Sequence, residues 1–512
     1  MNESPPFHLR VPPREADGRP AISPSLERVR ELAARYGQVA LSHTYIADCE
    51  TPVSAFLKLR DGGPAFLLES VERGNLGRHS MIGVRPQAVI RGAGGRLVQR
   101  DAAGNERDLD ASDPFGAVED AVRAVRMAPS DEPLAFTGGA VGYYGYDLVR
   151  TVERLPDVPD DDLGVPDLVQ LISGPVVLFD HLRRTLTLVV PCPVAADRDP
   201  VEAYAQATER IVELKRRLTG PVPSPDPSST PRIGEVRPNM PREAYESAVR
   251  QAQEYVFAGD AFQVVPSQRF SVATNLDPFS IYRALRTVNP SPYMFFFECD
   301  DLTLVGSSPE LLVKAEGDHV QTHPIAGSRP RGTDEEDDQR LADELLGDPK
   351  ERAEHVMLVD LGRNDLGRVS RTGTVRVSEL MDVRRYSHIM HIESTVEGHL
   401  RPELRASDAL RATFPAGTLS GAPKVRAMEI IDELEPTKRG PYGGALGWIG
   451  WDGDMDTCIT IRTLVCTDGR VHVQAGAGVV ADSQPATEYH ESRNKAAALL
   501  RAIEVAAGEE TW

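Results

Sequence analysis

Two short segments of the chain carry acidic residues at helical spacing, and binding of a metal ion is the chemistry they could support. Glu351 and Glu354 lie three residues apart, and so do Glu488 and Glu491, with Lys495 one turn further on. Residues three or four apart share one face of a helix, so two helices could direct paired carboxylates into one pocket. Mg²⁺ suits few carboxylates, because it keeps several waters and then binds an anionic substrate. Surface salt bridges, such as an ordinary i,i+4 pair of Glu491 and Lys495, explain the same spacing, and spacing alone favours them.

Three glycine-rich segments could bind an anion through their backbone. They are 324–329 after an expected strand, 417–424 before an expected helix, and 476–478. Successive backbone N–H groups in such loops can surround a carboxylate. Turns and helix caps use the same residues, and the sequence alone slightly favours that simpler explanation.

The charge balance excludes several classes of function. The chain has 512 residues, with 57 Lys and Arg against 77 Asp and Glu, which gives a net charge of −20 at pH 7. An extended nucleic-acid surface needs clustered Lys and Arg, and so does docking on anionic lipid. We therefore expect neither nucleic acid nor a membrane as a partner.

The cysteines and the N-terminal sequence indicate the compartment. The five cysteines are far apart and include no CxxC pair, which argues against a disulfide framework or a zinc site and favours a reducing compartment. The first residues lack the apolar core of a signal peptide, and no apolar run is long enough to span a membrane. These features predict a cytoplasmic protein.

Composition divides the chain into four segments. Residues 1–22, rich in proline and charge, are expected to form a flexible tail, and 220–237, rich in proline and serine at its start, to form a linker. The linker separates an N-terminal part, 23–219, from a C-terminal part, 238–512. At about 150 residues per domain the length allows roughly three domains, so composition rather than length sets this division.

The apolar pattern predicts strands and helices in both parts. Paired apolar runs predict hairpins over 56–70 and 176–190, and longer series predict meanders over 302–325 and 445–480. Helices are expected after Pro241 and Pro423, because apolar residues recur there on one face: Tyr245, Val249, Ala252 and Val256, then Val425, Met428, Ile431 and Leu434. Hairpins interspersed with helices indicate an α+β fold with mainly antiparallel sheets.

Taken in order along the chain, these segments resemble the chorismate-utilising enzymes, and most closely the large, chorismate-binding subunit of anthranilate synthase. The resemblance covers nearly the whole chain and is strongest over 239–508. It rests on GDAFQVVPSQRF, NPSPYMFFF, GSSPELLV, PIAGSRPRG, KERAEHVMLVDLGRND, the segment around His391, TFPAGTLSGAPKVRAMEIIDELE, YGGALGW, DTCITIRT, QAGAGVVADS and ESRNKA. It implies a sandwich of antiparallel β-sheets surrounded by helices.

The resemblance also implies a reaction and a cofactor. Chorismate, a dianion with an enolpyruvyl ether, would accept ammonia at C2, lose its C4 hydroxyl and eliminate pyruvate to give anthranilate. Glu354 and Glu491 would bind Mg²⁺, which holds the ring carboxylate of the substrate. Glu351 and Glu488 would lie nearby and act through water. A dication at this place neutralises substrate charge and the charge that develops during the reaction.

Other residues acquire roles by the same resemblance. Glu310 would protonate the departing hydroxyl, which requires a raised pKa, and His391 would assist the elimination while Thr418 positions the substrate. Chorismate would be contacted by Gly327, Ser328 (commonly Thr in the family), Tyr442, Arg462, Gly476, Ala477, Gly478 and Lys495. Tyr442 and Arg462 would hold the enolpyruvyl carboxylate, which a planar guanidinium fits well.

Two positions distinguish relatives within the family. Relatives that add water commonly carry Lys near the position of Gln263, and Gln263 cannot act as such a base, so ammonia is the expected nucleophile. Aminodeoxychorismate synthases commonly carry Lys in place of Ala326. Both positions favour anthranilate synthase, and aminodeoxychorismate synthase or another chorismate-utilising enzyme is the alternative.

The resemblance further implies a partner chain and an inhibitor. None of Cys49, Cys192, Cys299, Cys458 and Cys466 lies in the glycine-flanked context of a glutaminase nucleophile. A separate glutamine amidotransferase subunit is therefore expected, in a hetero-oligomer with two copies of each subunit. Tryptophan would bind as feedback inhibitor at Ser70, Pro292, Tyr293 and Met294, with Leu446 and Trp448 in the same pocket.

Overall fold

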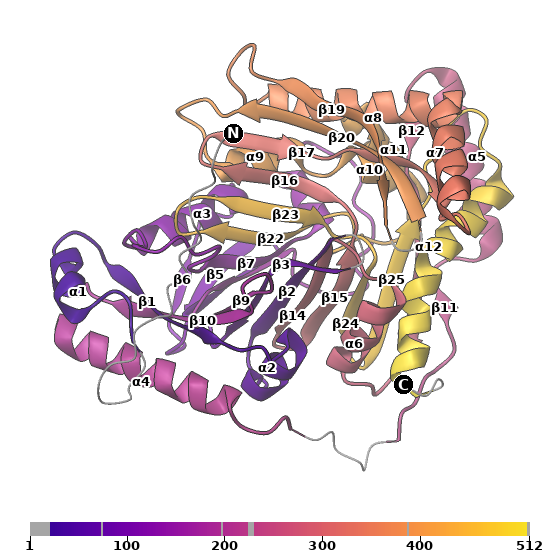
Figure 1. The fold of residues 1–512 in the computed structure, drawn as a ribbon. Coiled ribbons are helices and arrows are strands. Elements are labelled where there is room, and N and C mark those ends of the chain that lie inside the picture. The colour runs from indigo at the N-terminus through magenta and orange to yellow at the C-terminus, as the bar shows by residue number, and fades with distance from the viewer. Residues whose placement is uncertain (1–20, 73–74, 196–197, 224–229, 387–388, 509–512) are drawn as a thin grey trace.

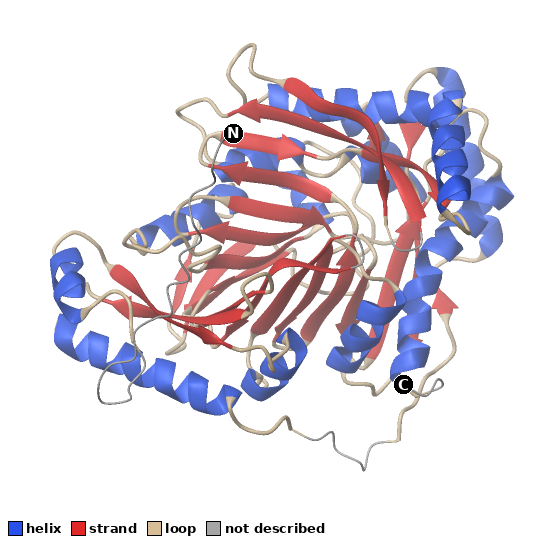
Figure 2. Ribbon diagram, in the orientation of Figure 1, coloured by secondary structure: helices blue, strands red, loops and turns tan. Residues whose placement is uncertain are grey.

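The computed structural model describes residues 21–72, 75–195, 198–223, 230–386 and 389–508. The expected tail at 1–22 and the middle of the expected linker at 220–237 lie mostly outside these residues. In the described part of the chain, two large sheets face each other and helices cover their outer surfaces (Figures 1 and 2). Every strand pair within the sheets is antiparallel, so the predicted α+β sandwich is confirmed.

The first sheet combines strands from both parts of the chain. Its order is β1 (Gln38–Ile46), β10 (Thr185–Pro193), β9 (Val176–Asp180), β3 (Asn75–Val84), β2 (Ala65–Glu72), β14 (Tyr293–Cys299), β15 (Leu302–Ser308), β24 (Thr463–Thr467), β25 (Arg470–Gly476), β13 (Ser267–Ala273) and β11 (Arg237–Pro238). The N-terminal strand β2 pairs directly with β14 beyond the linker, so the two parts share one sheet.

The second sheet is shared in the same way, through β7 and β22. Its order is β18 (Ile325–Pro330), β20 (Ile389–His399), β17 (His319–Thr322), β16 (Leu311–Glu316), β23 (Met455–Ile459), β22 (Ala445–Gly450), β7 (Gly139–Tyr144), β8 (Leu168–Ile172), β4 (Ala88–Ala93), β5 (Arg96–Asp101) and β6 (Glu106–Asp108), with β19 (Arg376–Arg385) paired to β20. A small third sheet joins β12 (Gln263–Val264) to β21 (Gly421–Ala422).

Helices pack on the outer faces of the sandwich. They are α1 (Leu26–Ala33), α2 (Pro52–Leu59), α3 (Pro114–Ala124), the 3₁₀ helix η1 (Tyr146–Thr151), α4 (Pro200–Leu218), α5 (Arg242–Ala258), α6 (Pro278–Val288), α7 (Glu335–Gly347), α8 (Pro349–Gly367), α9 (Ala406–Thr413), α10 (Gly417–Ser420), α11 (Lys424–Leu434) and α12 (Pro485–Ala506). None of the helices in the described ranges has the length and apolar character needed to cross a bilayer.

The side chains of each strand alternate between the two faces of its sheet, and this alternation divides the core into layers. Phe295 and Phe297 of β14 pack between the sheets against Val141 and Leu446, whereas Phe296 packs outward against α6. Successive side chains of a strand point to opposite faces, so one strand supplies both layers. The long apolar runs predicted as strands therefore lie in the centre of the sandwich.

Several predicted elements differ in the structure. The hairpin predicted over 56–70 is wrong, because residues 56–59 form the last part of helix α2. At the start of this helix Thr51 and Ser54 form a capping box, and Pro52 occupies the first turn. The hairpin at 176–190 is confirmed as β9 and β10. The two meanders are interrupted, because β15 and β16 belong to different sheets, as do β23 and β24.

The two predicted helices are confirmed as α5 and α11. In α5, Tyr245, Val249 and Ala252 are buried as expected. In α11, Met428 and Ile431 are buried, but Val425 in the first turn is 37% exposed. The apolar face of α11 therefore begins one turn later than the sequence pattern predicted.

Candidate active site

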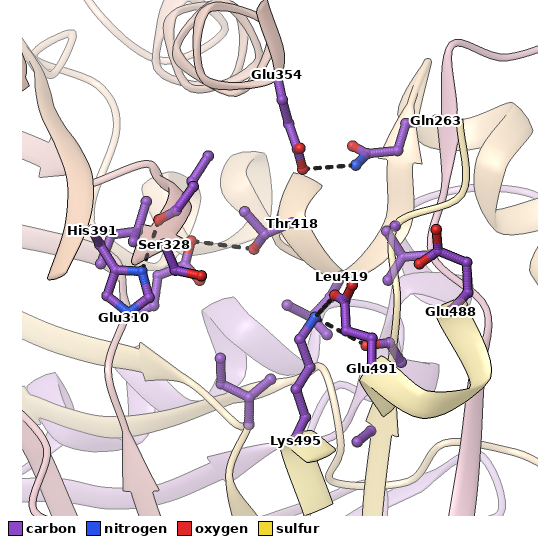
Figure 3. Close-up of a pocket in the computed structure, with 18 of the residues that line it drawn as sticks. Gln263, Glu310, Ser328, Glu354, His391, Thr418, Leu419, Glu488, Glu491 and Lys495 are labelled. Atoms are coloured by element: carbon purple, nitrogen blue, oxygen red, sulfur yellow. Dashed lines mark hydrogen bonds and ion pairs between the residues drawn. The ribbon is translucent and has the colours of Figure 1, made fainter. Parts of the chain in front are cut away.

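A cavity of about 780 Å³ lies where α8 and α12 approach the ends of β18, β20 and β25. Residues from several separate segments of the C-terminal half line it, and Figure 3 shows a number of them directed into the same space. The predicted site residues that line the cavity are Gln263, Glu310, Gly327, Ser328, Glu354, His391, Thr418, Tyr442, Arg462, Gly476, Gly478, Glu491 and Lys495. Ala477 does not line it; this residue is fully buried, and its backbone N–H donates to the Pro266 carbonyl at 3.3 Å.

Helix α8 places the first acidic pair. The helix begins at Pro349, and the Asp348 carboxylate accepts the backbone N–H groups of Lys350 and Glu351 at 2.9 and 3.4 Å. This cap fixes the first turn. Glu351 and Glu354 then line the cavity from one face, as the spacing predicted.

The Glu354 carboxylate is half-buried and reaches down into the cavity (Figure 3). It accepts a hydrogen bond from Nε2 of Gln263 at 3.1 Å. Burial raises the pKa of Glu354, and the like charges of Glu351 and Glu491 raise it further. The carboxylate therefore lies in a site with more negative charge than its neighbours neutralise.

Helix α12 places the second acidic pair opposite the first. Glu488, Glu491 and Lys495 all line the cavity. Nζ of Lys495 lies 2.8 Å from Oε1 of Glu491 and donates to the Gly476 carbonyl at 3.1 Å. The expected i,i+4 ion pair therefore exists, but it lies at the cavity and not on a remote surface. Burial also raises the pKa of Glu488.

Glu351 has a structural partner that the sequence did not suggest. Nη1 of Arg329 donates to its Oε1 at 3.1 Å and thereby ties β18 to α8. Gly327 lies beside this pair with φ +69°, and a Cβ there would come within 2.8 Å of Oε2 of Glu351. Only glycine tolerates both this conformation and this contact without strain, so the loop keeps the acidic wall close to the backbone.

Glu310 follows the end of β15 and is 7% exposed. Burial raises its pKa to about 8, although a hydrogen bond from Oγ1 of Thr418 to its Oε1, at 3.2 Å, opposes the shift. At pH 7 this carboxyl group is therefore mostly protonated. A neutral carboxylic acid in a substrate-sized cavity is suited to donate a proton.

His391 lies on β20 opposite Ser328 of β18. Its Nδ1 is 2.9 Å from the Gly327 carbonyl, and because a carbonyl only accepts, Nδ1 must carry the proton. Nε2 then has a free lone pair in the neutral ring. Burial lowers the pKa of His391, and the nearby positive charges of Arg462 and Lys495 lower it further, so the ring is neutral at pH 7.

Arg462 supplies a cation to the same cavity. It has φ +50°, a strained conformation for a bulky residue, and its carbonyl accepts the Ser307 N–H at 3.0 Å. Burial lowers the pKa of its guanidinium, and in the described part of the chain no carboxylate pairs with it. Tyr442, buried and protonated because burial raises the pKa of its phenol, lines the same cavity. Together they offer hydrogen-bond donors to an anion.

Some lining residues were missed by the sequence analysis. On α12 they are Thr487 and Asn494, which lie four and three residues from Glu491 and so could have been found from helical spacing, and His490, which is adjacent to Glu491. Gln474 on β25 and Leu419 in α10 also line the cavity. Both lie within motifs that carry the family resemblance, but their residue types do not mark them as cavity residues, because only the tertiary fold brings these segments together.

Of the residues expected to bind tryptophan, Ser70, Tyr293 and Met294 lie on paired strands, and Pro292 lies just before β14. In the antiparallel register Ser70 of β2 is opposite Tyr293 of β14, and Glu69 is opposite Met294. Tyr293 packs in the layer between the sheets, in the same apolar cluster as Leu446 and Trp448. Met294 belongs to the other layer, against α6, so only its backbone can face a ligand between the sheets.

No group of three or more His, Cys, Asp and Glu side chains within the described ranges is assembled to hold a metal ion. The cavity instead presents Glu354 and Glu491 from two helices, with Glu351 and Glu488 one turn earlier. Mg²⁺ commonly binds proteins through one or two carboxylates and completes its shell with waters and substrate oxygens. The donor set and the uncompensated charge at Glu354 therefore fit a hard divalent cation.

Comparison with known proteins gives a consistent family. The family model described as chorismate binding enzyme matches residues 63–501. A protein of Thermus thermophilus named anthranilate synthase component 1 is 51% identical over 90% of this chain and 97% of its own length. Proteins with the same name from Pseudomonas putida and Acetivibrio thermocellus are 48% and 45% identical, each over 94% of this chain and nearly all of their own lengths.

Solved structures show the same architecture. The crystal structure of anthranilate synthase component I from Streptococcus pneumoniae matches with a TM-score of 0.74 at 37% identity, over 89% of this chain and 98% of that one. The menaquinone-specific isochorismate synthase MenF of Escherichia coli matches with a TM-score of 0.68 over 93% of this chain and 98% of that one, but at 18% identity, and so shares the fold alone.

Proposed function

The chain belongs to the family of chorismate binding enzymes, and on that premise we propose that it is the large subunit of an anthranilate synthase. It would convert chorismate and ammonia to anthranilate, pyruvate and water, in the first step of tryptophan biosynthesis. The observation that carries the proposal is the separation of charge in one cavity. The guanidinium of Arg462, which pairs with no carboxylate among the described residues, shares that cavity with the acidic pairs of α8 and α12.

This separation suits a dianionic substrate with two different carboxylates. Arg462 and the Tyr442 hydroxyl would hold the enolpyruvyl carboxylate directly, because a guanidinium fork matches two carboxylate oxygens. The backbone at Gly327, Gly476 and Gly478 would complete the contacts. The ring carboxylate would then face the acidic helices, where direct contact is repulsive.

Mg²⁺ is the proposed cofactor, and Glu354 and Glu491 would hold it. When bound, it would supply positive charge that neutralises the ring carboxylate and the charge developing on it. Glu351 stays bound to Arg329, so it would act on the metal site through water at most. Gln263 orients Glu354 by its 3.1 Å hydrogen bond.

The acid and the base of the reaction are distinct groups. Glu310, protonated below its pKa of about 8, would give its proton to the C4 hydroxyl, which leaves as water while ammonia bonds to C2. Nε2 of His391 would then take the C2 proton as the C–O bond between the ring and the enolpyruvyl group breaks, and the enolpyruvate that leaves would take up a proton to become pyruvate. Thr418 would keep the Glu310 carboxyl oriented through their hydrogen bond.

The choice of nucleophile rests on Gln263 and Ala326. An amide cannot act as a base toward water, and in this cavity the Gln263 amide already donates to Glu354. Ala326 offers no amine for the chemistry expected of aminodeoxychorismate synthases. That activity, or another reaction of chorismate, remains the second candidate.

A separate glutaminase subunit is the proposed source of ammonia, in an assembly with two copies of each subunit. Cys192, Cys299, Cys458 and Cys466 are buried, and burial raises the pKa of each thiol, which disfavours the nucleophilic thiolate. Cys49 is exposed, but it lies on the loop between β1 and α2, remote in sequence from the glycine-rich segments. A cytoplasmic location stays a prediction from the sequence.

The reaction is tested with the purified chain, chorismate, Mg²⁺ and ammonium. We expect anthranilate, identified by fluorescence and mass, with one pyruvate per anthranilate, and loss of turnover when EDTA removes the metal. Glutamine alone should give almost no product. Formation of isochorismate, of aminodeoxychorismate or of no product would contradict the proposal, and robust glutamine-driven turnover by the lone chain would contradict the separate glutaminase.

Tryptophan is the proposed feedback inhibitor, bound near Ser70, Pro292, Tyr293 and the backbone of Met294. The strands give this site a short connection to the catalytic residues. Tyr293 is opposite Ser308 in the β14–β15 pair, and β15 leads directly to Glu310. Ser307, the residue before Ser308, donates its backbone N–H to the Arg462 carbonyl. A shift of β14 when tryptophan binds would therefore displace Glu310 and Arg462.

Replacing Ser70 by Arg should weaken tryptophan inhibition at least tenfold, which corresponds to about 1.4 kcal/mol, while chorismate turnover persists. The Ser70 side chain packs against Gly77, where an added Cβ would already lie 2.5 Å from Oγ, so a long cation cannot fit without moving the strands. The measurement is the tryptophan concentration for half-inhibition, with Leu182→Arg on an exposed turn as control. Unchanged inhibition would remove Ser70 from the site.

A further inference from the structure

Arg439 is a buried cation directly behind the active-site cavity. It is 2% exposed and lies just after α11, three residues before Tyr442. It does not line the cavity, so it cannot touch a substrate there. Its partners, however, are the segments that form the cavity wall.

The guanidinium joins two of these segments by their backbone. Nη1 donates to the Leu419 carbonyl at 2.6 Å, and Nη2 donates to the Val265 carbonyl at 2.7 Å. Leu419 follows Thr418, and Val265 lies two residues after Gln263, and all four residues line the cavity. Arg439 thus links the segment that orients Glu310 to the segment that orients Glu354.

A buried carboxylate extends the network to a third segment. Glu435 accepts two hydrogen bonds from Arg439, at 2.6 and 3.0 Å, and two from Ser267, at 2.7 Å from its N–H and 2.9 Å from its hydroxyl. Oγ of Ser267 in turn accepts from Nε2 of Gln474 at 2.8 Å. Gln474 lines the cavity two residues before Gly476.

The cation also lies against the ring of Tyr442. The Arg439 guanidinium carbon is 5.6 Å from the Tyr442 ring centroid and 4.6 Å from that of Tyr146, within the range of cation–π attraction. Burial raises the pKa of Tyr442, and the positive charge of Arg439 opposes that rise. The charge therefore both fixes the ring and makes its hydroxyl a better hydrogen-bond donor.

We propose that Arg439 is a positioning residue that aligns Tyr442, Thr418 and Gln263 for one bound substrate. The inference rests on the proposed function, because the anion held by Tyr442 would be the enolpyruvyl carboxylate of chorismate. Only arginine offers donors in a planar fan wide enough for two carbonyls and a carboxylate at once. Lysine could keep the Glu435 ion pair but not all the other contacts.

A purely structural ion pair is the competing explanation. Buried ion pairs often contribute little net stability, and loss of one partner leaves a costly buried charge. Removing Arg439 would then lower stability without changing how substrate binds. Arg150 provides a matched control, because it pairs at 2.9 Å with Asp432 of α11, three residues before Glu435, and does not line the cavity.

The test compares Arg439→Lys, Arg439→Met and Arg150→Met with the unmodified chain. Chorismate KM and kcat are measured with Mg²⁺ and ammonium, chorismate Kd by calorimetry without ammonium, and Tm by calorimetry. We expect KM and Kd to rise about tenfold in Arg439→Lys and further in Arg439→Met. Arg150→Met should lower Tm with KM and Kd unchanged. Tyr442→Phe should raise KM on its own but add little in the Arg439→Lys background.

Two results would overturn the positioning role. One is a folded Arg439→Lys chain with unaltered KM and Kd for chorismate. This result would be decisive even if Arg439→Met fails to fold. The other is an equal rise of KM in Arg150→Met, which would reduce the effect to general destabilisation. Failure of the proposed function is seen separately, as absence of ammonium-dependent anthranilate formation by the unmodified chain.

Discussion

Replacing Glu310 by Gln is expected to lower kcat about 10³-fold, within the range typical for loss of a general acid. Glutamine keeps the shape of the side chain and can still accept the Thr418 hydrogen bond, but it has no proton to give to the leaving hydroxyl. Binding of Mg²⁺ and chorismate should change little, because Glu310 is not among the acidic pairs of α8 and α12.

The pH dependence follows from the raised pKa of Glu310. The proposed role of Glu310 requires its acid form, so the turnover of the unmodified chain should be retained up to about pH 8 and fall above it as this carboxyl group loses its proton. The residual turnover of Glu310→Gln should not fall above pH 8 in this way. Raised pKa values also mean that ionisation of Glu310 costs stability, so the folded state should weaken as pH rises from the ordinary glutamate range through 8.

Glu298→Gln is the matched control, since Glu298 is a buried glutamate on β14 whose pKa burial also raises and which does not line the cavity. It should change stability and leave kcat and its pH profile unaltered. If Glu310→Gln kept more than a tenth of the kcat, the proton would have to come from another group.

Replacing Glu354 or Glu491 by Gln is the second large effect. Each substitution should weaken Mg²⁺ binding about 100-fold or more, since losing even an outer partner of a metal ligand costs 10- to 100-fold. Turnover should fall to a few per cent at ordinary Mg²⁺ and recover partly at high Mg²⁺. Both outcomes are measured, as the Mg²⁺ concentration for half-maximal rate and as Kd by calorimetry with chorismate present.

The two helices provide internal comparisons. Asp360→Asn changes an exposed carboxylate of α8 that pairs with Arg363 and does not line the cavity, so it should leave Mg²⁺ binding unaltered. Glu488→Gln, one turn before Glu491, should have a smaller effect than either ligand substitution. Equal Mg²⁺ affinity in Glu354→Gln and the unmodified chain would remove this residue from the metal site.

Local spacing identified the two acidic pairs, although by itself it favoured surface salt bridges as their explanation. Glu351 with Glu354 and Glu488 with Glu491 share helix faces in the structure as the sequence predicted, because helical geometry alone fixes those relations. That the two faces meet in one cavity could not be read from spacing. The resemblance to a family supplied that step, and it supplied Glu310, His391 and Arg462 as well.

The errors have particular physical causes. The apolar run at 56–59 predicts a strand, although Thr51, Pro52 and Ser54 are start signals of a helix that includes it. The meander at 302–325 failed at Pro309, where the chain leaves one sheet and enters the other, because apolar alternation does not record which sheet a strand joins. Tertiary context decided both outcomes.

Arg439 shows the limit most clearly. Its local sequence, Lys-Arg-Gly-Pro, is typical of a solvated turn. Its partners at Val265 and Leu419 lie 174 and 20 residues away along the chain, and its burial depends on all of them. A buried arginine of this kind is visible only once the backbone carbonyls that it bridges are placed in space.

The most direct measurement of the central claim is anomalous X-ray diffraction from crystals of the chain grown with chorismate and Mn²⁺, which prefers the same oxygen ligands as Mg²⁺. The account predicts one anomalous peak bound by the carboxylates of Glu354 and Glu491 and by an oxygen of the bound ligand, and no such peak in Glu354→Gln crystals. An anomalous peak elsewhere would contradict the account. So would chorismate bound in the cavity with no metal at the carboxylates of Glu354 and Glu491.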